Sequence, residues 1–126
     1  MSRIVYDAAV LVAADRNDRR TWAEHKARLE VGVVPSVPAT VVAQVSRSPK
    51  QAQLRRFLTG CAVVALGESE AHEAGRLLGK SRTADVIDAV VVTIALRQHA
   101  MILTGDPDDI ERLVVASGRD AAVVAV

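Results

Sequence analysis

Short apolar runs alternate with longer helix-forming segments along nearly the whole chain, and this alternation limits the folds open to it. The runs that favour strands fall at residues 3–6, 33–37, 61–66, 100–104 and 121–126. Segments with helical spacing lie between them, at residues 8–14, 19–31, 38–45, 50–58, 68–80, 84–99 and 107–117. Strands that alternate with helices form a mostly parallel sheet covered on both faces. We therefore predict an α/β fold, a three-layer α/β/α sandwich.

The helical segment at residues 84–99 is the most hydrophobic part of the chain. Between Ala89 and Leu96 only Thr93 is polar, which predicts a helix that is buried on most of its faces. Thr83, just before the segment, is the predicted N-cap. A chain of 126 residues fits a single domain, so we assign residues 1–126 to one domain.

Composition narrows the classes of function. The net charge of +1 is too small to indicate nucleic-acid binding through the overall field. Any RNA contact would depend on local arginine clusters, which occur at Arg16, Arg19 and Arg20 and again at Arg47, Arg55 and Arg56. Cys61 is the only cysteine, which excludes an internal disulfide and a multi-cysteine zinc site. Because there is no signal segment and no apolar stretch of about 20 residues, we expect a cytoplasmic protein without membrane contact.

Acidic residues gather at three distant points that the predicted fold brings together. Asp7 follows the first strand, Asp88 lies in the first turns of the buried helix, and Asp106 follows the strand that ends at Thr104. Ligands of parallel α/β sheets bind beyond the carboxyl ends of the strands, and the start of a helix favours an anion. Because carboxylates repel one another, their convergence indicates a bound divalent cation. Oxygen ligands suit Mg²⁺ or Mn²⁺.

Each of these acids also has a simpler structural interpretation. Asp7, taken alone, is typical of a turn residue or a helix cap. Asp85 can serve the helix dipole from the surface, and Asp106 can cap a helix that has Pro107 in its first turn. The metal-site interpretation depends on the combination, since all three acidic positions fall at the same edge of the predicted sheet.

Three motifs resemble the PIN domain of the VapC-type toxins found in bacterial toxin–antitoxin pairs. They are Ile4-Val-Tyr-Asp7, Asp85-Val-Ile-Asp88-Ala-Val-Val-Val-Thr-Ile-Ala and Leu103-Thr-Gly-Asp-Pro-Asp-Asp109. The resemblance covers essentially the whole chain in length and in element order. It implies an Mg²⁺-dependent endoribonuclease toxin that cleaves RNA phosphodiester bonds with metal-activated water. It also implies a homodimer, a cognate antitoxin protein and an RNA substrate such as tRNA or rRNA.

The resemblance assigns roles to individual residues. Asp7, Asp88 and Asp106 correspond to the metal-binding catalytic acids of the family. Thr104 corresponds to the small hydroxyl residue that supports the site, and Asp109 to an auxiliary acid.

One position departs from the family pattern. The helix after the second strand usually carries a glutamate, and this chain has Gln44 there. Glutamine can offer a carbonyl oxygen to a metal or orient a water, but it brings no charge and cannot act as a base at neutral pH. Our hypothesis is that Asp85, which shares a helix face with Asp88, makes up for the missing charge.

Two other functions stay open at this point. A catalytically weakened PIN domain would bind RNA or a partner protein without cleaving, and Gln44 favours this alternative. A phosphoacceptor signalling domain is also three-layered and of similar length. It usually needs paired acids after its first strand and a lysine after a late strand, whereas Asp7 stands alone and no lysine follows Lys80.

Overall fold

Five short strands form the centre of the protein. The structure is a computed structural model that describes residues 3–126, so residues 1 and 2 of the predicted domain lie outside it. The strands are β1 (Ile4–Tyr6), β2 (Ser36–Pro38), β3 (Ala62–Val64), β4 (Met101–Thr104) and β5 (Val123–Ala125). They lie in the order β3-β2-β1-β4-β5, and every neighbouring pair is parallel. The predicted parallel sheet is confirmed.

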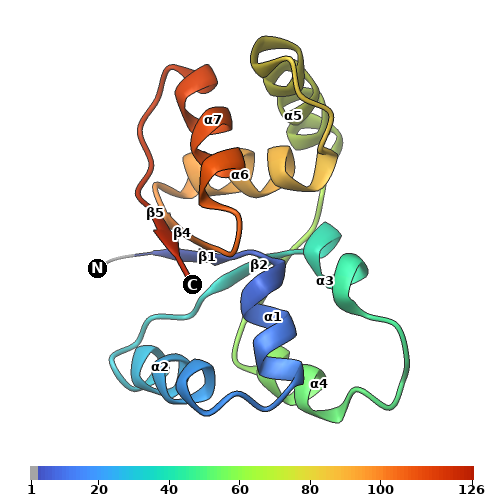
Figure 1. Cartoon of the computed structure of the whole chain (residues 1–126), viewed down its shortest axis with the longest axis vertical. Helices are drawn as coiled ribbons and strands as arrows, with labels where there is room; N and C mark the ends of the chain where they lie inside the picture. The colour runs from blue at the N-terminus through green and yellow to red at the C-terminus, as the bar shows by residue number, and fades with distance from the viewer. Residues whose placement is uncertain (1–2) are drawn as a thin grey trace.

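Helices cover both faces of this sheet. They are α1 (Ala8–Asp15), α2 (Arg19–Glu30), α3 (Ala39–Val45), α4 (Ala52–Thr59), α5 (Glu68–Ser81), α6 (Val86–Gln98) and α7 (Pro107–Ser117). Figure 1 shows α5, α6 and α7 on one side of the strands and α1, α2 and α4 on the other. The α3 helix follows β2 directly and packs against both α1 and α6. The arrangement is the predicted three-layer sandwich.

The strand order separates this fold from that of phosphoacceptor signalling domains. Those domains have the flavodoxin-like order 2-1-3-4-5. Here β1 is central and the chain passes outward through β2 to β3 before it returns to β4 on the other side of β1. The topology therefore argues against the phosphoacceptor alternative.

The α6 helix is the buried centre of one helical layer, as its sequence predicts. Every residue from 88 to 96 is buried. Its start differs from the prediction, because Asp85 and not Thr83 is the N-cap: the Asp85 Oδ1 accepts a hydrogen bond from the backbone N–H of Asp88 at 3.0 Å. Thr83 instead shares a side-chain hydrogen bond of 2.7 Å with Ser81. Arg82, at φ 56°, ends α5 in the left-handed region, so α6 cannot begin until the chain has turned.

The other differences from prediction lie at the ends of elements. The strands predicted at 33–37, 61–66 and 121–126 have three residues each, the first of them shifted to Ser36–Pro38, and the helix predicted from residue 50 begins at Ala52. A strand extends only as far as its neighbour offers backbone partners, and β1 at the centre has three residues. None of the helices in residues 3–126 is both long and apolar enough to span a bilayer.

Candidate metal centre

The adjacent ends of β1 and β4 build the floor of the site. Tyr6 pairs in register with Leu103, so Asp7 and Thr104 emerge side by side. The Thr104 hydroxyl donates to Asp7 Oδ2 at 2.7 Å and accepts from the backbone N–H of Asp106 at 3.0 Å. Both Asp7 and Thr104 are buried. One hydroxyl thus links the two strand ends, and the supporting role that the resemblance implies for Thr104 stays a prediction.

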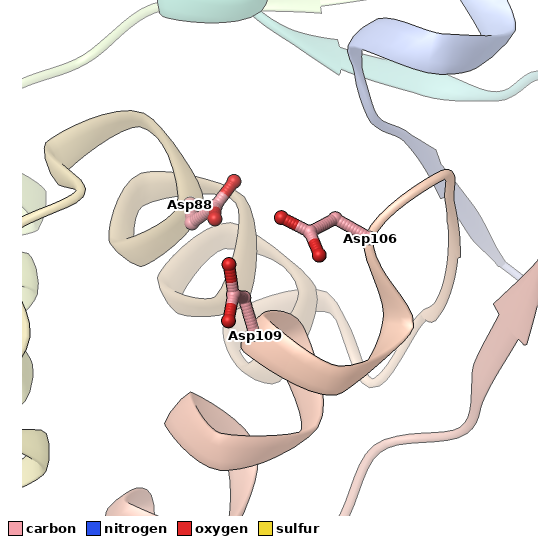
Figure 2. Close-up of side chains that lie close together, drawn as sticks. All are labelled: Asp88, Asp106 and Asp109. Atoms are coloured by element: carbon pink, nitrogen blue, oxygen red, sulfur yellow. The ribbon is translucent and has the colours of Figure 1, made fainter.

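Three carboxylates face one another above this floor. One oxygen from each of Asp88, Asp106 and Asp109 lies within 4.8 Å of the others. Figure 2 shows Asp88 reaching from α6 towards Asp106 and Asp109 at the start of α7. Asp88 is only 8% exposed, whereas Asp106 and Asp109 are exposed. We call these three residues the acid cluster.

The electrostatics of the cluster disfavour three bare carboxylates. Burial, together with the smaller effects of the charges of Asp85, Asp7, Asp106 and Asp109, raises the pKa of Asp88 from its usual 3.8 to about 7. The side-chain hydrogen bond with Asp109 raises the pKa of Asp106, with smaller contributions from burial and from the charges of Asp109, Asp7 and Asp108. The cation paired with the cluster among residues 3–126 is Arg112, whose Nη1 lies 3.6 Å from Asp109 Oδ1.

The donor atoms fit a hard divalent cation. Carboxylate oxygens are the ligands that Mg²⁺ and Mn²⁺ prefer, and Mg²⁺ binds them at 2.0–2.1 Å. Two oxygens on opposite sides of such an ion are about 4.2 Å apart. The 4.8 Å limit of the acid cluster is therefore close to a coordinating arrangement. A cation at this point would also offset the repulsion that raises the pKa of Asp88.

Asp7 lies beside the acid cluster and is engaged by protein groups. Its Oδ1 accepts from the backbone N–H of Ala8 at 2.7 Å, so the carboxylate caps α1 while its Oδ2 binds Thr104. Its charge contributes to the raised pKa values of Asp88 and Asp106, which places it near both. The structure therefore gives Asp7 the capping role of the simpler interpretation as well, and its role as a metal ligand stays a prediction.

The two remaining predicted residues have different surroundings. Asp85 is exposed and uses Oδ1 to cap α6, although its charge is the second largest cause of the raised pKa of Asp88. Gln44 is exposed near the end of α3 and makes no side-chain hydrogen bond to any of the residues that the structure describes. The predicted roles of Gln44 and Asp85 stay predictions.

Gly105 is a positioning residue to which sequence analysis gave no role. A Cβ atom at this glycine would lie 2.7 Å from the Cβ of Ala9 in α1, closer than side chains pack. The turn from β4 into α7 can therefore approach α1 only because residue 105 has no side chain. The sequence feature that could have indicated this close approach is the glycine between Thr104 and Asp106, together with the small residue Ala9 in α1.

The aromatic residue of α2 packs against the protein interior. The Trp22 Nε1 donates to the carbonyl oxygen of Ala14 at 3.1 Å, and the ring meets Phe57 edge-on. Arg56, from one of the predicted basic clusters, lies over this ring with its guanidinium carbon 5.4 Å from the ring centroid. Trp22 therefore anchors α2 against the interior of the protein.

Comparison with known proteins adds a fold-level match. No protein-family model and no curated protein sequence matches the chain. A chain in the crystal structure of VapBC2 from Rickettsia felis bound to a promoter DNA fragment superposes with a TM-score of 0.75 at 14% identity, covering 98% of both chains. A chain in the structure of FitAcB from Neisseria gonorrhoeae gives 0.65 at 14% identity, covering 96% of both. A toxin–antitoxin complex from Klebsiella pneumoniae gives 0.66 at 14% identity, covering 84% of this chain and 88% of that one. The fold is thus the PIN-like fold that the sequence motifs imply.

Proposed function

We propose that the protein is a divalent-metal-dependent endoribonuclease and the toxin of a toxin–antitoxin pair. The observation that carries this proposal is the acid cluster, in which oxygens of Asp88, Asp106 and Asp109 lie within 4.8 Å of one another beyond the ends of parallel strands. The similarity in fold to VapBC and FitAB complexes supports the toxin assignment.

Each acid contributes in a distinct way to the proposed reaction. Asp7, Asp88 and Asp106 remain the proposed ligands of Mg²⁺ or Mn²⁺, and the geometry supports adding Asp109. A bound metal of this kind supplies Lewis acidity, which lowers the pKa of water and offsets the charge of a phosphodiester. Asp88 must lose its proton to act as a ligand, and its raised pKa makes this loss depend on the cation. Thr104 holds Asp7 in place through its 2.7 Å hydrogen bond.

The proposed partners follow from the same assignment. The complexes with similar chains are toxin–antitoxin assemblies, so we propose a cognate antitoxin for this chain, together with a homodimer of the toxin. The proposed substrate is RNA, with tRNA and rRNA as the first molecules to test. The near-neutral overall charge means that RNA binding would depend on the metal and on local basic residues.

A second candidate is a PIN domain that binds RNA or its partner without cleaving. Gln44 favours it, because this exposed amide stands where the family pattern has a carboxylate and therefore brings no charge to a metal. Substituting Gln44→Glu separates the two candidates, since it restores the family residue on the surface of α3 at little cost to the fold.

The proposal is tested by incubating tRNA and rRNA with the purified chain, freed of any partner, in Mg²⁺, in Mn²⁺ and in EDTA. We expect discrete cuts that need the metal and disappear in Asp106→Asn, while the matched control Asp120→Asn, an exposed acid outside the cluster, cleaves like the wild-type chain. Cleavage that persists in EDTA would contradict the proposal. If the Gln44→Glu variant cleaves and the wild-type chain does not, the non-cleaving alternative would be supported.

The role of Asp85 needs its own variant. If Asp85 makes up for the missing glutamate, Asp85→Ala should weaken Mn²⁺ binding about tenfold, the size of effect seen for groups that orient or tune metal ligands. Asp85→Asn keeps the capping oxygen but removes the charge. It should therefore weaken Mn²⁺ binding to a similar degree while preserving the stability of the fold. Metal affinity unchanged in both variants would leave Asp85 as a helix cap only.

A further inference from the structure

A second polar cleft, of about 260 Å³, lies between α5, α6 and α7, and none of the acid cluster lines it. The three helices stand together on one side of the sheet in Figure 1. The residues that give it polar groups are Glu73, Arg76 and Lys80 from α5, Thr93 from α6, and Ser117 and Arg119 at and just beyond the end of α7. The cleft thus combines three cationic side chains with two hydroxyl groups.

The charge of this cleft is predominantly positive. Glu73, the one acid in its lining, is engaged by Arg97, whose Nε lies 2.7 Å from Glu73 Oε2. Arg76 and Lys80 stand one helical turn apart, where like charges repel, and within residues 3–126 neither forms an ion pair with an acid. An anion between them would relieve this repulsion.

The cleft also borders a hydroxyl group without a partner. Thr93 is 1% exposed, and its Oγ1 makes no hydrogen bond to any residue of the described chain. A helical threonine commonly donates to the carbonyl one turn earlier, and Thr93 does not. It is the only polar residue in the apolar stretch from 89 to 96, so its hydroxyl is a buried donor beside a cationic cleft.

Two of the cations have additional local contacts. Arg119 donates from Nη2 to the carbonyl oxygen of Leu96 at 3.0 Å, which fixes its guanidinium at the end of α6. Lys80 lies in the last turn of α5, where a positive charge complements the helix dipole. Arg76 lies one turn earlier and has no such helix-end role. Helix-end electrostatics therefore account for two of the three charges but not for Arg76 or for the Thr93 hydroxyl.

We propose that this cleft binds a phosphate group. Arg76, Lys80 and Arg119 would supply the charge, and the Thr93 hydroxyl would donate to a phosphate oxygen. The volume admits a phosphate group with several waters, each of which takes about 30 Å³ in the liquid. The proposed function supplies one source, the backbone of an RNA strand engaged at the acid cluster, and a free nucleotide is the other. Only the choice of RNA as a source rests on the proposed function.

The site is tested by titrating inorganic phosphate into the full-length chain in EDTA, where no metal at the acid cluster can recruit the anion. We expect saturable binding. The double variant Arg76→Gln Lys80→Gln should weaken it about tenfold or more, because two charged contacts are lost. Thr93→Val, which has nearly the same shape and removes only the unpaired hydroxyl, should weaken it about fivefold with no loss of stability. The control Lys26→Gln Lys50→Gln, with the same loss of charge elsewhere, should bind like the wild-type chain.

A second arm identifies the source of the phosphate. Adenosine monophosphate and a single-stranded RNA oligonucleotide are each titrated in EDTA with phosphate as competitor. If phosphate displaces one of these two ligands, and the double variant no longer binds that ligand, the result supports the site and identifies that ligand as the source of the phosphate. Equal phosphate affinity in the double variant and in its lysine control would overturn the proposal. A melting temperature lowered only in the double variant would then show that these two cations stabilise the fold and do not bind phosphate. Because this assay needs neither metal nor cleavage, its failure is separable from failure of the nuclease proposal.

Discussion

Two polar clusters begin at consecutive residues, Tyr6 at the end of the first strand and Asp7 just after it, and their polar groups find partners to different degrees. The Tyr6 hydroxyl forms a 2.8 Å hydrogen bond with His25 Nδ1 and accepts another from Arg28 Nη1 at 3.1 Å. The His25 ring also lies 4.0 Å from that of Phe57. The buried hydroxyl of Tyr6 thus has two hydrogen-bond partners within the fold.

The next residue, Asp7, leads to a cluster that lacks such partners. Asp88, Asp106 and Asp109 present oxygens of the same charge to one another, and burial with repulsion raises the pKa of Asp88 to about 7. Charged groups held together against repulsion are typical of functional sites, whereas self-contained hydrogen-bond networks are typical of structural ones. The comparison supports a structural role for the first cluster and the proposed metal site for the second.

The largest expected effect is that of Asp88→Asn. Loss of this proposed ligand should lower RNA cleavage by roughly 100-fold or more. The same change removes a repelled carboxylate, so in EDTA at pH 8 it should raise the free energy of unfolding by about 1–3 kcal/mol. Parallel cleavage assays and urea unfolding measure the two effects. If Asp88→Asn lowers both the cleavage activity and the free energy of unfolding, Asp88 has a structural role like that of Tyr6 and His25.

Two glycines give the next comparison, because each lies against one cluster. A Cβ at Gly105 would meet the Ala9 Cβ at 2.7 Å, and a Cβ at Gly60 would meet His25 Nε2 and Leu29 Cδ1, both at 2.9 Å. Each alanine substitution should cost about 1–3 kcal/mol of stability through overpacking. Only Gly105→Ala should also weaken Mn²⁺ binding, by about tenfold, since it displaces the turn that carries Asp106. Equal metal affinity in both variants would separate Gly105 from the metal site.

Tyr6→Phe tests the structural cluster alone. The variant leaves the buried His25 without its hydroxyl partner, which should cost about 1–3 kcal/mol in the free energy of unfolding. Metal affinity and cleavage should stay within about twofold of the wild-type chain, because the hydroxyl touches no acid. A large loss of metal affinity would show that the two clusters are coupled through β1.

The smallest expected effect is a pH dependence of opposite sign for the two clusters. In EDTA the folded chain keeps a proton on Asp88 that the unfolded chain has lost, so this contribution to stability falls as the pH rises from about 4 to about 7. Burial lowers the pKa of His25 below its usual 6.5, with Arg28 adding to the effect, so its contribution is lost as the pH falls below 6.5. Urea unfolding of Asp88→Asn between pH 5 and 8 should lose the contribution of Asp88 and retain that of His25. An unchanged profile would contradict the assignment of Asp88.

The sequence was sufficient to predict much of the fold for identifiable reasons. The buried helix could be predicted because its apolar run is long, and the meeting of Asp88 with Asp106 because strand ends and helix starts share one edge of a parallel sheet. The predicted N-cap of α6 was wrong because Thr83 and Asp85 are both good capping residues and lie two positions apart. The left-handed turn at Arg82, which ends α5, delays the start of α6 until after Asp85. The contact between Tyr6 and His25 could not be predicted, since it depends on how α2 packs and not on any local pattern.

The acid cluster itself shows where side-chain detail exceeds the pattern. Asp109 joins Asp88 and Asp106 because it lies three residues after Asp106 at the start of α7, a spacing that was visible in the sequence. The hydrogen bonds that tie Asp7 to Ala8 and Thr104 depend on rotamers, which spacing does not determine.

Thermal unfolding of the wild-type chain in Mg²⁺ and in EDTA, at pH 8, tests the central claim most directly. If the acid cluster is completed by a cation, saturating Mg²⁺ should raise the melting temperature by several degrees, as expected for a ligand that binds only the folded state. The rise should be absent in Asp88→Asn and preserved in Tyr6→Phe. Equal melting temperatures of the wild-type chain in Mg²⁺ and EDTA, or an equal rise in Asp88→Asn, would contradict the account.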